Sequence, residues 1–124
     1  MPHAAEPTDE VLLDAAGRGD PRAFQLLVER YEGRVAAVVV SMLGPGPDAD
    51  DVGQETFIRL YKSIDRFRGD ASLGTYITRI AINQSLKALK RRKKWRERFF
   101  ARDSNETVAD DNLVDESTVD NGEV

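Results

Sequence analysis

The groups with the clearest chemical potential lie between residues 66 and 94, where a short polar loop leads into a basic segment. At about 100° per residue of a helix, one sector roughly 80° wide collects an aromatic ring, a guanidinium, an amide and several ammonium groups. These are Tyr76, Arg79, Asn83, Lys87, Lys90 and Lys94. Cations neutralise phosphates, an amide can pair with a base edge, and an aromatic ring can stack on an unpaired base. This arrangement favours nucleic-acid binding over the structural alternative, a solvated basic helix end.

The loop before this segment contains residues suited to holding a small group. Gly69 lets a backbone approach a ligand closely, and Asp70 and Ser72 can donate or accept hydrogen bonds at the start of a helix. A base swung out of a duplex can be read by its edge in such a pocket. A simple turn between helices, with Ser72 as the N-cap, stays open as the alternative.

The chain offers little for catalysis or metal binding. Its single histidine is His3 and it has no cysteine, so a Ser–His or Cys–His pair and a zinc site are not expected. The acids Asp48, Asp50, Asp51 and Glu55 match no calcium loop and are interpreted as helix-terminus acids with a solvated face. We therefore expect no cofactor, no metal and no enzymatic activity.

The formal net charge of −4 hides a strong segregation of charge along the chain. Of the 18 Lys and Arg residues, eight lie between Lys87 and Arg98, whereas residues 103–124 hold eight acids and no Lys or Arg. Such segregation predicts two surfaces with different partners. We expect one domain over residues 1–102, and an unstructured acidic linker over 103–124 that leads to a further domain.

An all-α bundle of about four helices is expected to position these groups. The predicted helices are 8–16, a long helix starting at Asp20 and Pro21, 48–67, and one from about Ser72 that fades between 94 and 100. The breaker GPGP at 44–47 separates the second helix from the third.

Two apolar stripes are expected to form the core. The second helix contributes Phe24, Leu27, Val28, Tyr31, Val35, Val38, Val39 and Met42, and the third contributes Val52, Phe57, Leu60, Tyr61 and Ile64. The longest apolar stretch, 35–43, is about half of what a membrane crossing needs, and no signal-peptide pattern is present. With no cysteine either, we expect a cytoplasmic protein without membrane insertion.

Two ordered motifs resemble region 2 of bacterial extracytoplasmic-function (ECF) sigma factors. That family carries D-A-E-D-V-x-Q-E-T-F and, after a loop, F-x-T-W-L-x-R-I-A-x-N. This chain has DADDVGQETF at 48–57, and it matches the second motif with Leu73, Thr75, Tyr76, Ile77, Arg79, Ile80, Ala81 and Asn83. The resemblance spans about residues 20–98. Leu73 stands where the family usually has Phe, and Tyr76 where it usually has Trp.

The resemblance implies specific partners and roles. Docking on the β′ coiled coil of core RNA polymerase is implied for Asp51, Gln54, Glu55, Arg59 and Leu60. Capture of a base flipped from the non-template strand of the promoter −10 element is implied for Phe67, Arg68, Gly69, Asp70 and Ser72. Contact with that element and help in opening it are implied for Thr75, Tyr76, Arg79, Asn83, Lys87, Lys90 and Arg91.

The family's second domain, a helix-turn-helix that reads the −35 element, is not in this sequence. An anti-sigma factor is a further expected partner. The alternative is a sigma-like interaction domain, a decoy or an adaptor bound by a regulator. The basic, Asn-bearing face separates the two interpretations, because a decoy has no need of it.

Overall fold

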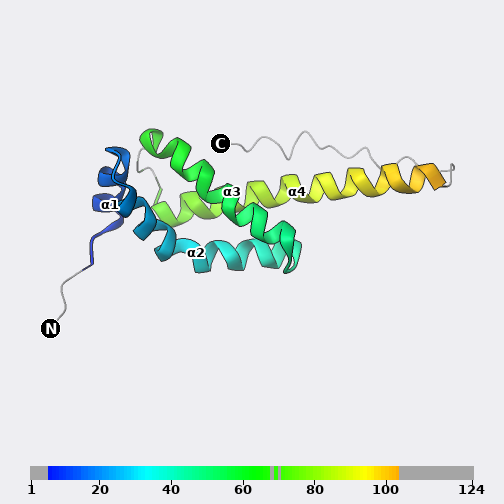
Figure 1. Cartoon of the computed structure of the whole chain (residues 1–124), viewed down its shortest axis with the longest axis horizontal. Coiled ribbons are helices and arrows are strands. Elements are labelled where there is room, and N and C mark those ends of the chain that lie inside the picture. Colours follow the sequence, from blue (N-terminus) through cyan, green and yellow to red (C-terminus); the bar gives the residue numbers. More distant parts are fainter. Residues whose placement is uncertain (1–5, 68, 70, 104–124) are drawn as a thin grey trace.

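The computed structural model describes residues 6–67, 69 and 71–103, and the regular elements within these ranges are all helical. They are α1 (Asp9–Gly17), α2 (Pro21–Leu43), α3 (Pro47–Ser63), the 3-10 turn η1 (Ile64–Arg66) and α4 (Leu73–Asp103), as Figure 1 shows. The predicted all-α fold is confirmed. Arg68, Asp70, His3 and the acidic segment 104–124 lie outside the described residues.

The helices begin where the capping signals place them. Thr8 Oγ1 accepts a hydrogen bond from the backbone N–H of Val11 at 3.2 Å, which starts α1. Asp20 Oδ1 accepts from the N–H of Arg22 at 3.0 Å, and Pro21 takes the first position of α2. In the turn between α2 and α3, Gly44 and Gly46 have φ angles of 81° and 138°, a region that favours glycine.

The ends of the last two helices differ from the prediction. α3 stops at Ser63 rather than near Phe67, and Ser63 Oγ donates to the carbonyl of Arg59 at 2.9 Å as the chain tightens into η1. α4 continues to Asp103, beyond the expected fading point. Its last turns contain good helix formers and no Gly or Pro, and Lys93 pairs with Glu97 at 3.9 Å on the same face.

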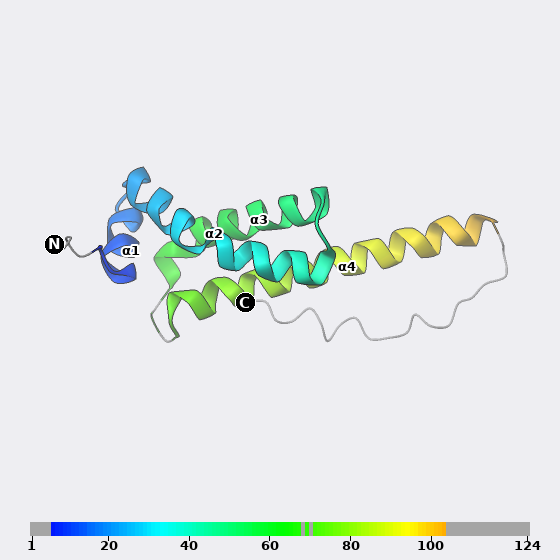
Figure 2. The same cartoon turned by 90° about the horizontal axis from the view of Figure 1, so that it is seen from below.

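The core lies where α2, α3 and the first half of α4 pack together, with α1 against α2 (Figures 1 and 2). Leu27, Leu60 and Ile77 are fully buried at its centre. Every buried residue among the described ones lies between Leu12 and Ala88. α4 runs on beyond the other helices, so its final turns have no helix beside them in either view.

The buried stripe of α3 agrees with the prediction at Val52 and Leu60, and Phe57 and Ile64 pack against the core, but Tyr61 does not belong to it. Its buried residues are Ala49, Val52, Thr56 and Leu60. Thr56 is tolerated inside because its hydroxyl donates to the carbonyl of Val52 at 2.8 Å. Tyr61, expected in the core, is 55% exposed and forms a T-shaped ring pair with Phe24, with ring centroids 5.0 Å apart.

Arg92, which lies within α4, joins that helix to the end of α2 and to the start of α3. Arg92 donates from Nε and Nη2 to Asp48 Oδ2 at 3.0 Å each, and from Nη2 to the carbonyl of Leu43 at 3.0 Å. Leu43 is the last residue of α2, so its carbonyl has no partner within the helix. Arg92 therefore belongs to the scaffold, and one of the eight cations between Lys87 and Arg98 is engaged in holding the fold.

Candidate nucleic-acid and protein interfaces

The start of α4 is fixed by Ser72. Its Oγ accepts from the N–H of Thr75 at 3.1 Å and donates to Thr75 Oγ1 at 3.0 Å, while its carbonyl accepts from the N–H of Tyr76 at 3.0 Å. Ser72 is therefore the N-cap of α4, an arrangement that both a simple turn and a base-binding loop allow. The side chain is also exposed, as is Gly69, whose φ of 83° favours glycine.

Tyr76 holds the two ends of the loop together. Its hydroxyl donates to Ser63 Oγ at 2.7 Å, at the end of α3. Its ring centroid lies 4.8 Å from that of Phe67 at an interplanar angle of 42°. Through these two contacts Tyr76 ties the start of α4 to Phe67 and to the end of α3. Phe67 and Tyr76 are both half-buried.

A second set of contacts, which the sequence analysis missed, supports the start of α4 from α2. Gly74 is buried, and a Cβ added there would lie 2.2 Å from Arg34 Nη1. Arg34 in turn lies over the ring of Tyr31, 5.5 Å from its centroid. The missing side chain of Gly74 thus leaves room for the guanidinium. A glycine within an otherwise regular helix pattern was the available signal.

Tyr31 extends this support to α1. Its hydroxyl donates to Asp9 Oδ2 at 2.5 Å, and Asp9 Oδ1 accepts from Arg30 Nη1 at 2.9 Å. Burial raises the pKa of Tyr31 above its usual value, and the hydrogen bond to the Asp9 carboxylate acts in the same direction. The tyrosine therefore stays protonated and keeps donating at neutral pH.

The predicted nucleic-acid residues of α4 are brought onto one unbroken helix. Thr75, Arg79, Lys87 and Arg91 are exposed, whereas Asn83 and Lys90 are half-buried. Because the helix continues without a break, the sector worked out from the sequence holds over its length. The structure places this face directly after the capped loop.

The predicted polymerase-binding residues lie on α3, with one correction. Asp51, Gln54 and Arg59 are exposed and Glu55 is half-buried, with Glu55 Oε2 accepting from Arg59 Nε at 3.0 Å. Leu60 is 0% exposed, so it cannot supply apolar contact to a partner. Its burial agrees with its place in the predicted apolar stripe of α3, whereas the docking role came only from the resemblance.

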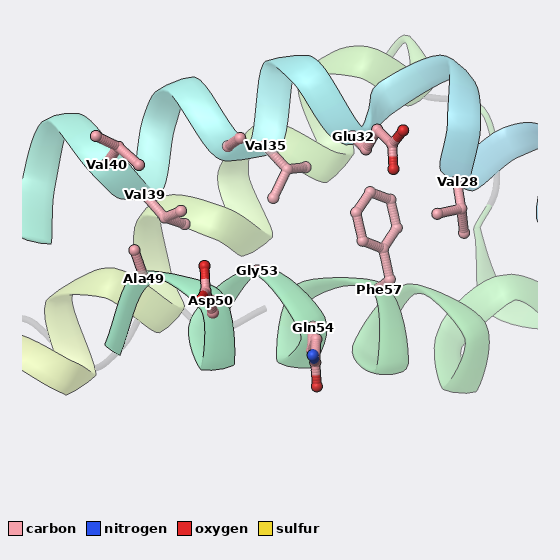
Figure 3. A pocket seen from close by; sticks show the side chains of 11 residues that line it. Val28, Glu32, Val35, Val39, Val40, Ala49, Asp50, Gly53, Gln54 and Phe57 are labelled. Atoms are coloured by element: carbon pink, nitrogen blue, oxygen red, sulfur yellow. The ribbon is translucent and has the colours of Figure 1, made fainter. Parts of the chain in front are cut away.

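A groove between α2 and α3 was not predicted (Figure 3). Its volume is about 290 Å³, and its lining is mostly apolar, including Val35, Val39 and Phe57. Three polar residues also line the groove: Glu32 of α2, and Asp50 and Gln54 of α3. The run of apolar residues at 36–40, wider than one stripe needs, was the sequence signal.

The described ranges contain no cluster of three or more His, Cys, Asp or Glu side chains placed to hold a metal ion. None of the helices in these ranges has the length and apolar character to cross a membrane.

Known proteins with the same pattern are sigma factors. The family model described as Sigma-70 region 2 matches residues 27–96. The chain is 47% identical over 76 residues to the ECF RNA polymerase sigma-E factors of Salmonella typhimurium and Escherichia coli. It is 41% identical over 75 residues to the RNA polymerase sigma-H factor of Pseudomonas aeruginosa. These matches cover 60–61% of this chain and 39% of each relative, so the chain spans about two fifths of their length.

Two solved structures share the fold. One is the NMR structure of an engineered region 2 of sigmaE in complex with GTAAAA, with a TM-score of 0.68 and 36% identity over 74% of this chain and 96% of that one. The other is CnrH in complex with the cytosolic domain of CnrY, with a TM-score of 0.59 and 33% identity over 64% of this chain and 51% of that one. Since the family model matches more than half of its residues, the chain belongs to the sigma-70 region 2 family.

Proposed function

We propose that this chain is the part of an ECF sigma factor that binds core RNA polymerase, recognises the promoter −10 element and helps to open it. The observation that carries the proposal is the direct succession of a capped loop and a cationic helix face. The likeness to an engineered region 2 of sigmaE solved with GTAAAA supports it. On this account the chain is a binding module and not an enzyme.

The loop between Phe67 and Ser72 receives a base flipped from the non-template strand. Its two ends are held by the Phe67–Tyr76 ring contact and by the Ser72 cap, so these ends are in place before the base arrives. Arg68, Gly69 and Asp70 supply the remaining loop groups, with donors and acceptors for the base edge.

The helix face after the loop holds the strand. Arg79, Lys87 and Arg91 are exposed cations placed to neutralise phosphates, which contributes affinity that is independent of sequence and weakens with salt. Asn83 and Thr75 add hydrogen-bonding groups on the same helix, and Lys90 adds a further cation. Phosphate contacts fix the position of the strand, and the loop contributes the selectivity.

The polymerase docks on α3. Asp51, Gln54, Glu55 and Arg59 present a charged face, and the adjacent groove supplies the apolar area that Leu60 cannot. A β′ coiled coil with basic residues gains orientation and on-rate from the acids, and apolar contact from the groove.

The experiment is fluorescence anisotropy with labelled oligonucleotides. We expect a single strand containing GTAAAA to bind more tightly than the matched duplex. Lys87→Ala and Arg91→Ala should each weaken all sequences alike and lower the salt slope by about one. Asp70→Ala should instead reduce discrimination at one base and leave the salt slope unchanged. Equal or tighter duplex binding, or a change of base preference in Lys87→Ala, contradicts the proposal.

A second candidate is a protein-interaction domain bound by a regulator without promoter recognition. The observation in its favour is the likeness to CnrH, which was solved with the cytosolic domain of CnrY. An anti-sigma factor would then be the main partner, and the α2–α3 groove is the surface with room for its apolar side chains. Failure of every single-stranded oligonucleotide to bind would favour this candidate.

A further inference from the structure

The core-facing side of α4 continues as an aromatic surface after the bundle has ended. At about 100° per residue, Trp95 has the helical phase of Ile77, and Phe99 has that of Ala88 to within about 20°. Ile77 and Ala88 are 0% and 4% exposed, whereas Trp95 and Phe99 are 62% and 49% exposed. The same face of one helix is therefore buried in its first half and uncovered in its second half (Figures 1 and 2).

The uncovered aromatic rings form one surface. Trp95 and Phe99 stack with centroids 5.2 Å apart and an interplanar angle of 7°, and Phe100 meets Phe99 edge-on at 5.5 Å. We call these three residues the aromatic end of α4. An exposed surface of three aromatic rings, covered by no other helix of the described chain, has the character of a docking site.

Exposed cations surround the aromatic end. They are Arg91, Lys94, Arg96 and Arg98. A partner that covers this part of α4 must therefore combine apolar side chains with several negative charges.

The chain itself contains a segment with that composition. Residues 104–124 carry seven acids and no Lys or Arg, and Val108, Leu113, Val114 and Val119 are spaced among them. We propose that this acidic segment docks on the second half of α4, placing aliphatic side chains on Trp95 and Phe99 and acids beside the cations, and so competes with nucleic acid for this part of the helix.

The geometry permits such a return. From Asp103 back to Lys87 the helix rises about 24 Å, at 1.5 Å per residue. Residues 104–124 span up to about 70 Å when extended, at 3.3–3.6 Å per residue. A tethered segment acts at an effective concentration on the order of a millimolar, so a weak contact suffices to keep it docked. The proposal depends on charge and apolar surface of α4, and it holds whether or not the loop reads a base.

The experiment uses the full chain and two variants with the same change of net charge. The acidic-segment variant carries Asp110→Asn, Asp111→Asn and Asp115→Asn. The control carries Glu10→Gln, Asp14→Asn and Glu29→Gln, which are exposed acids on α1 and α2. Trp95 is the single tryptophan, so its fluorescence reports on this surface alone.

Acrylamide quenching of Trp95 tests the docking. In 50 mM NaCl we expect the native chain and the control to be quenched about two- to threefold less strongly than the acidic-segment variant, and the three chains to converge at 500 mM, where charges are screened within about 4 Å. Equal quenching of all three at low salt overturns the proposal. Protection that grows with protein concentration also overturns it, because a second copy would then be the occupant.

Binding of a 20-nucleotide oligo-dT tests the competition. If the segment covers α4 in about 70–90% of native molecules, its release in the acidic-segment variant tightens the apparent Kd for oligo-dT about three- to tenfold relative to the control at 50 mM NaCl. Equal affinity of the two variants overturns the proposal. Loss of oligo-dT binding by all chains, with Trp95 still protected by the segment, would contradict the proposed promoter function and leave the docking established.

Discussion

Replacing Arg92 by alanine should destabilise the domain, although Arg92 belongs to a basic segment that resembles a nucleic-acid face. The guanidinium makes two contacts of 3.0 Å with Asp48 and one of 3.0 Å with the carbonyl of Leu43. Removing it disconnects α4 from the turn between α2 and α3 and leaves a C-terminal helix carbonyl without its partner. Arg91→Ala removes the same charge from an exposed site and is the matched control.

The size of the effect follows from exposure. The side chains of Arg92 and Asp48 are 37% and 56% exposed, so their ion pair is screened and contributes only about 0.2–1 kcal/mol. The hydrogen bond to the Leu43 carbonyl adds about 1 kcal/mol. A total of about 1.5 kcal/mol corresponds to a fall in Tm of about 6–12 °C for a domain of this size. Arg91→Ala should stay within about 0.5 kcal/mol of the native chain.

Thermal unfolding followed by circular dichroism, together with oligonucleotide titrations at several salt concentrations, separates stability from binding. We expect Arg92→Ala to lower Tm and keep the salt slope, and Arg91→Ala to keep Tm and lower the slope by about one. Arg92→Lys should recover only part of the stability, because an ammonium lacks the planar fork. The reasoning is refuted if the two alanine variants have the same Tm, or if Arg92→Ala lowers the salt slope.

Three further changes test other parts of the structure. Because burial raises the pKa of folded Tyr31, its contribution to stability is complete below about pH 10 and is lost as pH rises through the folded pKa. In urea unfolding, the free energy of unfolding should fall more between pH 8 and pH 11 in the native chain than in Tyr31→Phe. Equal falls in the two chains would contradict this. Tyr76→Phe should cost about 1 kcal/mol by losing the hydroxyl bond to α3 and should weaken base discrimination, which anisotropy with single-base variants measures. Asp51→Lys with Glu55→Lys should leave Tm within a few degrees, because Asp51 is exposed and the screened Glu55–Arg59 ion pair contributes little. The change should abolish pull-down of a β′ coiled-coil fragment, and retained pull-down would remove α3 from the docking surface.

Local signals were enough to predict the helices and their starts. Thr8, Asp20 with Pro21, and Ser72 cap the helices through their own side chains or fixed φ, which depends on a few neighbouring residues. The end of α4 was misjudged because increasing charge was taken as fading helix, whereas Lys, Arg and Glu are good helix formers.

What the sequence could not supply is the phase and pairing of the helices. Hydrophobicity alone favoured Tyr61 over Thr56 in the core of α3, but the angle at which α3 meets its neighbours buries Thr56 and leaves Tyr61 at the edge. The packing of α3 on α2 also leaves the groove beside Phe57, which no sequence pattern predicted. The pairing of Arg92 with Asp48, 44 positions apart, likewise depends on tertiary placement.

The central claim is that the loop and the α4 face together bind the −10 strand, and nuclear magnetic resonance locates this binding directly. The ¹⁵N-labelled chain is titrated with GTAAAA and with the scrambled hexamer AAATGA, and backbone amide shifts are compared residue by residue. We predict shifts over 67–72 and along Tyr76, Asn83 and Lys87 with GTAAAA. The scrambled hexamer should give weaker shifts that are confined to the cations of α4. Shifts of equal size with both hexamers, or shifts centred on α3 and the groove, would contradict the account.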